Sequence, residues 1–268
     1  SLPTWLIQEL IKQNGEIATR EMIESINDAP SQSIRVNTLL ATDEDVVTSL
    51  ETEGFTAIKS VVAAHAYVVS GGHVASSKAY HDGLLTIQDE SAMLPVESMQ
   101  LTADVKQVLD AAAAPGGKAT QIAQYIADDA KITALDVHAH KIKLIENNAK
   151  RLHVDGKIDA RVLDARQVHE KIETKFDRIL VDAPCSGFGL LRRKPEIRYD
   201  KTLEDVQNLS RLQLEILDSV SKSIADNGMI VYSTCTILRQ ENDDVVTKFV
   251  NTHPEFELVP TQTVYNLK

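Results

Sequence analysis

Apolar residues follow two different rhythms in the first third of the chain. From Trp5 to Ile26 they recur every three or four positions, which predicts helices with a break at Asn14-Gly15. After Pro30 the pattern predicts strands at 33–40, 55–62 and 66–71 around a helix at 43–54. Together these elements indicate a small α+β unit of about 80 residues.

From about Leu84 onward, short apolar runs alternate with longer segments of helical spacing. Strands are expected at 105–111, 131–136, 159–164, 177–182 and 228–234, and helices at 118–127, 139–153, 203–225 and 239–253. This alternation is typical of an α/β domain with a parallel, doubly wound sheet. We therefore expect two domains, residues 1–83 and 84–268, with ligands beyond the carboxyl ends of the second domain's strands.

Composition narrows the class of protein. The chain has 268 residues, of which 43% are hydrophobic, so it can bury a sizeable core. Only two residues are cysteine, which favours a reducing, cytoplasmic setting without disulfides. No apolar run is long enough to span a bilayer, so no membrane partner is expected. The net charge of −11 argues against nonspecific coating of nucleic acid, although a local basic patch is compatible with it.

Aspartates follow the expected strands. They are Asp110, Asp136, Asp164 and Asp182. Acids gathered at the ligand edge of one sheet suit a ligand rich in hydroxyls and amines rather than phosphates. Aspartate also begins turns and caps helices, and we expect that plainer role for Asp110.

The segment "AAAAPGGKAT" after Asp110 forms a turn of small residues between a strand and a helix. It lacks the first glycine and the final Ser or Thr of a phosphate-binding loop, and it is not the G-x-G-x-x-G fingerprint. Its backbone can approach a ligand closely, and free N–H groups at a helix start favour a carboxylate. Asp136 lies 18 residues past Lys118, about where an acid binds ribose in nucleotide sites. A ligand with a carboxylate, a ribose and an adenine but no phosphate is S-adenosylmethionine.

Both cysteines stand just past apolar runs, Cys185 in "ILVDAPC" and Cys235 in "MIVYSTC". A free cysteine is most often a small buried hydrophobe. No second cysteine stands at metal-ligand spacing, so no metal site is expected. If the thiols do chemistry, either of them could be a nucleophile.

Four segments in succession resemble the motifs of RNA 5-methylcytosine methyltransferases: "LDAAAAPGGKAT", "ALD", "LVDAPCSGFG" and "YSTCTILRQEN". The closest subgroup is the RsmB type (also called Sun or Fmu) of bacterial 16S rRNA enzyme, and "LLRRKPEIRYDKT" favours it. The resemblance covers nearly the whole chain. It implies a Rossmann-like class I methyltransferase fold, preceded by a small α+β, RRM-like subdomain that binds RNA.

The resemblance also implies a cofactor site for S-adenosylmethionine. Its residues would be Ala112, Ala113, Ala114, Pro115, Gly116, Gly117 and Lys118 at the methionine end, Asp136 on the ribose, Asp164 by the adenine, and Asp182 near the methionine or the target base. The family commonly has cysteine where this chain has Ala112. We expect little effect, because the backbone role needs no thiol.

Catalytic roles follow from the same resemblance. Carbon 5 of cytosine is a poor nucleophile until a thiolate adds to carbon 6, so covalent catalysis is needed. DNA enzymes attack from a Pro-Cys motif, but the RNA enzymes attack from the Thr-Cys motif. The resemblance therefore implies Cys235 as nucleophile and Cys185 as assistant in product release. Asp182 would contact the base, and Lys118 would contact the base's carbonyl or Asp182.

RNA contacts are expected from the densest cationic stretch, which contains Arg192, Arg193, Lys194 and Arg198. A solvated loop is the alternative for each of them. The resemblance adds Arg35 and Asn37, for which a structural role joining the small domain to the sheet is equally compatible.

We therefore expect a monomeric enzyme that acts on 16S rRNA. Two alternatives stay open: methylation of another RNA such as tRNA, and a ribosome-assembly RNA-binding protein with vestigial activity. Members of this type often carry a helical RNA-binding domain ahead of the segment "SLPTWL" and a further strand after "FELVP". From this we expect a catalytic core that binds S-adenosylmethionine normally and RNA weakly.

Overall fold

The computed structural model describes residues 2–265, and their contacts divide them into two units. The sheet unit comprises residues 31–182, 219–231 and 260–265. The helical unit comprises residues 2–30, 183–218 and 232–259. The chain crosses between the units at Asp182-Ala183, within helix α9 and within strand β9, so the two units share these elements.

The sheet unit begins with a four-stranded antiparallel sheet in the order β2-β3-β1-β4. Its strands are β1 (Gln32–Val36), β2 (Thr56–Lys59), β3 (Ala66–Ser70) and β4 (Leu85–Ile87), and its helices are α3 (Asp43–Thr52) and α4 (Lys78–His81). Thr42 caps α3 by accepting a hydrogen bond from the Asp45 N–H, which fixes where that helix begins. Because β4 pairs with β1, this sheet extends past residue 83, and the predicted domain boundary there stays a prediction.

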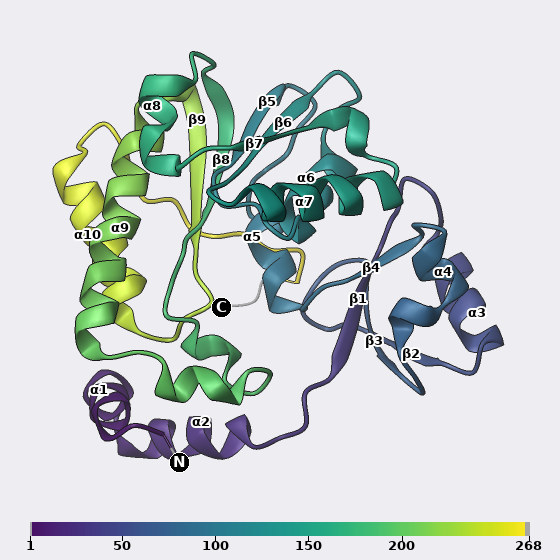
Figure 1. The fold of residues 1–268 in the computed structure, drawn as a ribbon, viewed down its shortest axis with the longest axis horizontal. Coiled ribbons are helices and arrows are strands. Elements are labelled where there is room, and N and C mark those ends of the chain that lie inside the picture. The colour runs from purple at the N-terminus through teal and green to yellow at the C-terminus, as the bar shows by residue number, and fades with distance from the viewer. Residues whose placement is uncertain (1, 266–268) are drawn as a thin grey trace. The chain divides into compact units, whose positions relative to one another are not determined.

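The same unit contains the five-stranded sheet, in the order β7-β6-β5-β8-β9 (Figure 1). Its strands are β5 (Gln107–Asp110), β6 (Lys131–Asp136), β7 (Ile158–Val162), β8 (Phe176–Asp182) and β9 (Ile224–Ser233). The pairs β5–β6, β5–β8 and β6–β7 are parallel. The parallel, doubly wound α/β fold and the preceding small α+β piece are thus confirmed.

Helix α5 (Leu94–Glu97) precedes the first strand of this sheet. Helices α6 (Gly117–Tyr125), α7 (Ala139–Arg151) and α8 (Val168–Lys171) lie between its strands. Helices α6 and α7 pack on β6 and β7, and Ile122, Ile132 and Ile145 are fully buried between them. Burial of such side chains stabilises the unit by about 1.5–3 kcal/mol each.

The helical unit contains α1 (Thr4–Asn14), α2 (Glu16–Ile26), most of α9 (Leu203–Ser221) and α10 (Asp243–Thr252). Gly15 separates α1 from α2 with a φ of 85°, at the break that the sequence predicts. Leu6 and Leu10 of α1 are buried with Phe188 and Leu238, and the Trp5 ring packs edge-on against Phe188 at 5.6 Å. Residues from both ends of the chain therefore build one core.

Short 3₁₀ helices complete the two units. They are η1 (Val74–Ser76), η2 (Ser91–Met93), η3 (Asp155–Lys157), η4 (Ala165–Gln167), η5 (Phe188–Leu190), η6 (Pro195–Tyr199) and η7 (Arg239–Glu241). Within residues 2–265, no helix has the length and apolar character needed to cross a membrane.

Several element ends differ from the sequence prediction by a few residues, and two of them show the reason. Helix α9 ends at Ser221 instead of residue 225, because the Phe176 N–H donates to the Ser223 carbonyl and strand pairing begins there. Strand β7 ends at Val162, so Asp164 lies beyond the strand and begins η4. In both places long-range pairing, which the local pattern does not report, decides the boundary.

Candidate active site

Aspartates line one edge of the five-stranded sheet. Asp110, Asp136 and Asp182 are the last residues of β5, β6 and β8, and Asp164 follows β7. Parallel strands place their carboxyl ends at the same edge. The chain order reverses between β5 and β8, and open α/β sheets bind ligands at such a reversal. The ligand edge of this sheet is therefore flanked by Asp110 and Asp182.

The turn from β5 to α6 is built for close approach. The Ala113 N–H donates to the Leu135 carbonyl at 2.7 Å, which fastens the turn to β6. Gly116 has a φ of 109°, and a Cβ there would lie 3.2 Å from the Cα of Ile145. Glycine is favoured on both counts. Helix α6 then begins at Gly117, with its first N–H groups at the ligand edge.

Lys118, in the first turn of α6, forms an ion pair with Asp182 at the end of β8. The Lys118 Nζ and the Asp182 Oδ2 are 2.8 Å apart, and both side chains are partly exposed. The resemblance implies a contact of Lys118 with either the carbonyl of the base or Asp182, and the structure contains the contact with Asp182. The pair joins the first turn of α6 to the end of β8 and leaves charged atoms accessible at the ligand edge.

Asp110 corrects an expectation. Its side chain is only 1% exposed, and neither carboxyl oxygen meets the geometry of a hydrogen bond, so it does not cap the helix that follows. The N-cap of α6 is Gly116 instead. Burial, with a smaller contribution from the Asp182 charge, raises the pKa of Asp110 to about 7.

The other two aspartates have local partners. Asp136 accepts a hydrogen bond from the His138 N–H at 3.0 Å. Asp164 accepts one from the Arg166 N–H at 2.9 Å and forms an ion pair with its guanidinium at 2.7 Å. These contacts with Arg166 lower the pKa of Asp164. The capping role expected of one strand-end aspartate therefore belongs to Asp164, the N-cap of η4.

The two thiols meet in the helical unit. The Sγ atoms of Cys185 and Cys235 are 3.1 Å apart, although the residues are 50 positions apart in sequence. Cys235 is exposed and Cys185 is partly buried. The hydrogen bond with Cys235, together with burial, raises the pKa of Cys185 well above its ordinary value. Cys185 therefore keeps its proton, and Cys235 has the more accessible sulfur of the two.

Arg35 and Asn37 are buried, with 1% and 3% exposure. The Arg35 guanidinium donates to the Gly117 carbonyl at 2.9 Å and to the Thr120 hydroxyl at 3.1 Å, both on α6. The Asn37 amide donates to the Leu152 carbonyl at 2.8 Å. Burial lowers the pKa of Arg35 to about 9. These contacts fasten the four-stranded sheet to α6 and to the end of α7, which favours the structural alternative over RNA contact.

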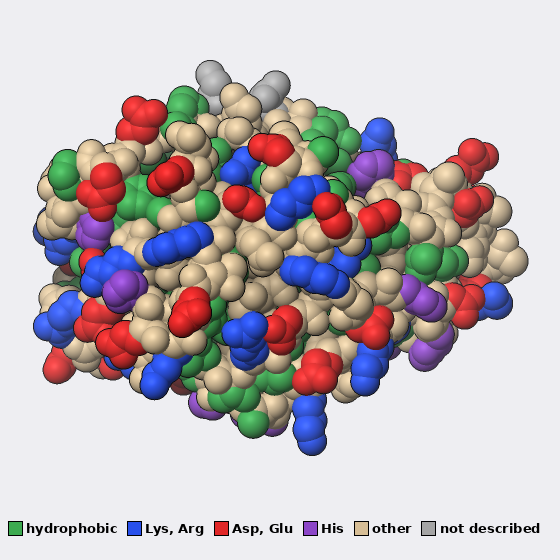
Figure 2. Space-filling model, turned by 90° about the horizontal axis from the view of Figure 1, so that it is seen from above, with side chains coloured by type: hydrophobic (Ala, Val, Ile, Leu, Met, Phe, Trp, Pro, Cys, Tyr) green, Lys and Arg blue, Asp and Glu red, His purple; other side chains and the backbone are tan. Residues whose placement is uncertain are grey.

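The cationic stretch of the helical unit is accessible. Arg192, Arg193 and Lys194 are exposed and Arg198 is partly exposed. The Arg192 Nε donates to the Ser25 carbonyl at 3.1 Å, so part of that side chain is engaged by α2. Figure 2 shows acidic and basic side chains interspersed on the face that it presents. RNA contact by these residues stays a prediction.

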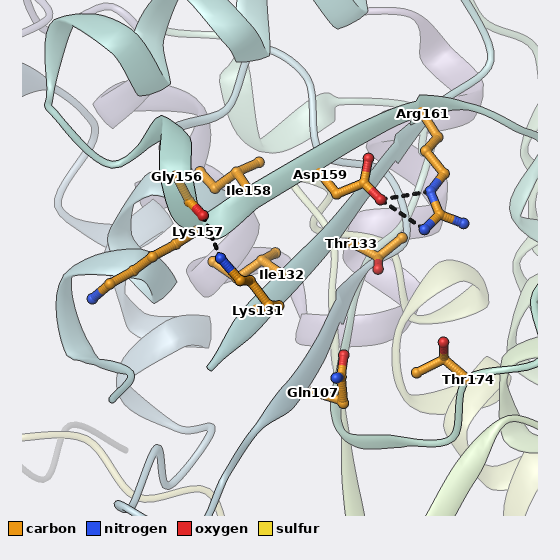
Figure 3. A pocket seen from close by; sticks show the side chains of 10 residues that line it. All are labelled: Gln107, Lys131, Ile132, Thr133, Gly156, Lys157, Ile158, Asp159, Arg161 and Thr174. Atoms are coloured by element: carbon orange, nitrogen blue, oxygen red, sulfur yellow. Dashed lines mark hydrogen bonds and ion pairs between the residues drawn. The ribbon is translucent and has the colours of Figure 1, made fainter. Parts of the chain in front are cut away.

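A pocket at the opposite edge of the five-stranded sheet carries no comparable chemistry (Figure 3). It is lined by Gln107, Lys131 and Ile158, the first residues of β5, β6 and β7. The Lys131 ammonium donates to the Gly156 carbonyl at 2.5 Å and is thus already engaged. Across residues 2–265, no group of three or more His, Cys, Asp or Glu side chains could hold a metal ion.

Sequence reasoning assigns no role to Glu241, although it lies in the segment "YSTCTILRQEN". Its side chain is fully buried and accepts hydrogen bonds from Ser186, the neighbour of Cys185. The sequence signal that could have indicated Glu241 is its spacing from Leu238 and Val245, which predicts that the three share one helical face. In the structure all three side chains are buried. An acid at an inward position of that face needs buried partners.

Two family models match the chain. Residues 99–268 match the model described as 16S rRNA methyltransferase RsmB/F. Residues 2–74 match the model described as the ferredoxin-like domain of RsmF/B-like methyltransferases. Together they cover the five-stranded sheet and most of the four-stranded one.

Individual proteins agree with this. A Bacillus subtilis protein named "Probable ribosomal RNA small subunit methyltransferase B" is 40% identical over 96% of this chain and 57% of its own length. The Photorhabdus laumondii ribosomal RNA small subunit methyltransferase B is 33% identical over 97% of this chain and 60% of its own. The chain thus spans about three fifths of the length of these curated relatives. A solved structure, a methyltransferase homolog protein from Pyrococcus horikoshii, is 27% identical with a TM-score of 0.82, covering 97% of this chain and 86% of that one.

Proposed function

Because the chain belongs to the RsmB/F family of 16S rRNA methyltransferases, we propose that it transfers a methyl group from S-adenosylmethionine to carbon 5 of a cytosine in small-subunit rRNA. The observation that carries the proposal is the pair of thiols 3.1 Å apart, one exposed and one held protonated. Covalent activation of cytosine needs one thiolate that attacks, and a second thiol can assist the later elimination.

The ligand edge of the sheet fits S-adenosylmethionine, which supplies an electrophilic methyl group on a sulfonium sulfur. The N–H groups at the start of α6 suit its carboxylate, and the small residues 112–117 let the backbone approach closely. The partly exposed carboxylate of Asp136 suits the ribose hydroxyls, and Asp164 lies after the next strand for the adenine. No phosphate-binding loop competes with this assignment.

In the proposed reaction the Cys235 thiolate adds to carbon 6 of the cytosine, and the electron pair shifts toward carbon 5. Carbon 5 takes the methyl group from the sulfonium sulfur, and that sulfur keeps the electron pair of the broken bond as a neutral thioether. A base then removes the proton from carbon 5, the bond between sulfur and carbon 6 breaks, and the Cys235 thiolate leaves. Cys185 holds a proton beside the Cys235 sulfur and can donate it to that sulfur as the thiolate leaves. Asp182 is assigned to the polar edge of the base, with Lys118 fixing the carboxylate through their 2.8 Å ion pair.

Along the chain, an aspartate of the ligand edge lies close to one of the two cysteines. Asp182 and Cys185 are separated by only Ala183 and Pro184. Carbons 5 and 6, where the reaction takes place, lie inside the base stack of a duplex, so the target cytosine has to be single-stranded or flipped out. Arg192, Arg193, Lys194 and Arg198 are the proposed phosphate contacts, because they are accessible cations on the segment that follows Cys185.

The deciding experiment uses radiolabelled S-adenosylmethionine, small-subunit rRNA and four proteins: wild type, Cys235→Ala, Cys185→Ala and the double variant. The chain has only two cysteines, so the double variant is a thiol-free control. On a denaturing gel, Cys185→Ala should accumulate a protein–RNA adduct, while Cys235→Ala should give neither adduct nor methylated RNA. An adduct that builds up in Cys235→Ala would instead assign the attack to Cys185.

The same assay with tRNA separates the remaining alternatives. Methylation of tRNA without methylation of rRNA would move the substrate to tRNA. Calorimetric binding of S-adenosylmethionine by wild type, with no methyl transfer to either RNA at RNA concentrations that saturate weak binding, would refute the enzymatic proposal and favour an RNA-binding assembly protein.

A further inference from the structure

Backbone hydrogen bonds join the segment that carries Cys185 to the segment that carries Cys235. The Ala183 N–H donates to the Ser233 carbonyl at 2.8 Å, and the Gly189 N–H donates to the Cys235 carbonyl at 2.9 Å. A Cβ at Gly189 would lie only 2.7 Å from that carbonyl oxygen, so the close approach requires glycine. These backbone contacts align segment 183–189 with the residues around Cys235.

A buried carboxylate lies behind the two segments. Glu241 is 0% exposed, and its Oε1 accepts hydrogen bonds from the Ser186 N–H at 2.8 Å and the Gln213 amide at 3.3 Å. Its Oε2 accepts from the Ser186 hydroxyl at 2.6 Å. The Gln213 amide also donates to the Pro184 carbonyl at 2.8 Å. A buried carboxylate with this many donors is well satisfied and forms stronger bonds than a neutral acceptor.

The direction of the hydroxyl bonds links Glu241 to the other thiol segment. Ser186 has one hydroxyl proton and donates it to Glu241. The 2.8 Å contact between the Ser186 and Thr236 hydroxyls must then have Thr236 as donor. The chain of hydrogen bonds therefore runs from Thr236, the neighbour of Cys235, through Ser186, the neighbour of Cys185, to Glu241.

Glu241 is itself held from both sides. The Tyr232 hydroxyl donates to the Glu241 carbonyl at 2.6 Å. The next residue, Asn242, donates to the Thr236 carbonyl at 3.0 Å, and its amide oxygen accepts from the Thr234 hydroxyl. The carboxylate thus belongs to a rigid segment that is fastened to the residues on either side of Cys235.

We propose that Glu241 is a positioning residue, which sets the separation of the two thiols by holding Ser186 against Thr236. The inference rests on the proposed function for its purpose, because a 3.1 Å contact between the thiols is what lets Cys185 pass a proton to the Cys235 sulfur. Glu241 touches neither substrate nor cofactor in this role, and it acts only through the neighbours of the two cysteines.

A trivalent arsenical measures the thiol pair without any methylation. Phenylarsine oxide reacts with two thiols to form two As–S bonds and one water, and this cyclic product resists displacement by excess monothiol only when both thiols can reach one arsenic. Wild type should bind one arsenical per chain. Glu241→Ala should lose resistance to monothiol by about tenfold or more, because the chelate depends on the effective concentration of the second thiol.

Matched variants separate a positioning role of Glu241 from a general loss of stability. Glu241→Gln keeps one acceptor for the Ser186 N–H and should retain most of the resistance to monothiol. Ser210→Ala removes the 2.7 Å hydrogen bond to the Gln240 carbonyl beside Glu241 without touching either thiol segment, and should leave arsenical binding unchanged. If Glu241→Ala fails to fold, Thr236→Val decides, because it breaks the same chain of bonds without leaving a buried carboxylate unpaired.

Wild-type resistance in both Glu241→Ala and Thr236→Val would overturn the inference, as would a wild type that binds no arsenical through both thiols. If Ser210→Ala loses resistance to monothiol as well, the loss reflects a general destabilisation of the fold, and the inference also fails. Loss in Glu241→Ala or Thr236→Val, with the control and Glu241→Gln intact, supports it. This outcome would stand even if no variant methylates RNA, which would count against the proposed function alone.

Discussion

Replacing Asp110 with asparagine should stabilise the protein, and the gain should grow as the pH rises. Asp110 is buried at the end of β5, and neither of its carboxyl oxygens has a hydrogen-bond partner. Asparagine has nearly the same shape as a protonated aspartic acid but has no proton to lose. The substitution therefore removes the cost of a buried negative charge without leaving a cavity.

The size of the effect follows from the pKa of Asp110, which burial raises from 3.8 to about 7, a difference worth about 4 kcal/mol. The folded state binds this proton more tightly than the unfolded state does. The free energy of unfolding therefore falls as the pH rises from about 4 to about 7, and the loss is complete above that range. Asp110→Asn lacks this loss, so its advantage over wild type should grow by about 3 kcal/mol between pH 5 and pH 8.

The assay is urea denaturation of both proteins at pH 5, 6, 7 and 8, with the free energy of unfolding extrapolated to water at each pH. Titrating groups that do not interact with Asp110 act equally in both proteins and cancel in the difference. A difference that stays constant across this range would refute the raised pKa. A variant that loses stability relative to wild type as the pH rises would show that the Asp110 carboxylate is stabilised, with Lys118 the nearest cation to explain it.

Three further substitutions test other parts of the fold by the same unfolding assay. Arg35→Met should cost at least about 2 kcal/mol, because buried acceptors on α6 lose their donor, and Arg35→Lys should recover only part; equal stability of all three would contradict this. Phe188→Ala should cost about 3–5 kcal/mol, because its ring is 1% exposed beneath Trp5; a cost below about 1 kcal/mol would mean that this core is loose. Asp164→Asn should remove less than about 1 kcal/mol at pH 7 and progressively less as the pH falls below about 4, because Arg166 lowers the pKa of Asp164 and that stability is lost as the pH falls through it; a difference that does not shrink in acid would exclude the ion pair as its source.

The strands of the sheet unit were predictable because strand and helix periods differ. Strand β8 spans Phe176–Asp182 and β6 spans Lys131–Asp136, close to the ranges that the apolar runs predict. Parallel strands share one carboxyl edge, so the position of Asp136 and Asp182 at that edge also followed from the pattern. The end of α9 did not, because its last turn gives way to pairing with a strand far away in sequence.

The features of the site residues also divide into those that the local sequence predicts and those that depend on contacts between distant segments. The positions of Cys185 and Cys235 after apolar runs are local facts, but their 3.1 Å separation joins residues 50 positions apart. Burial of Arg35 and the lack of partners for Asp110 depend on which elements pack around them. Glu241 escaped notice because its partner Ser186 lies on another segment.

Local residue order therefore specifies which elements form, which edge of the sheet receives ligands and which side chains could do chemistry. It does so because backbone preferences and apolar periodicity act over a few residues. Which of those side chains keeps its proton, which is buried and which meets its partner depends on desolvation and on contacts between distant segments. Packing alone makes those contacts, so only the folded chain determines that Cys185 and Cys235 lie together, that Asp110 carries an unpaired carboxyl, and that Glu241 lies behind both thiols.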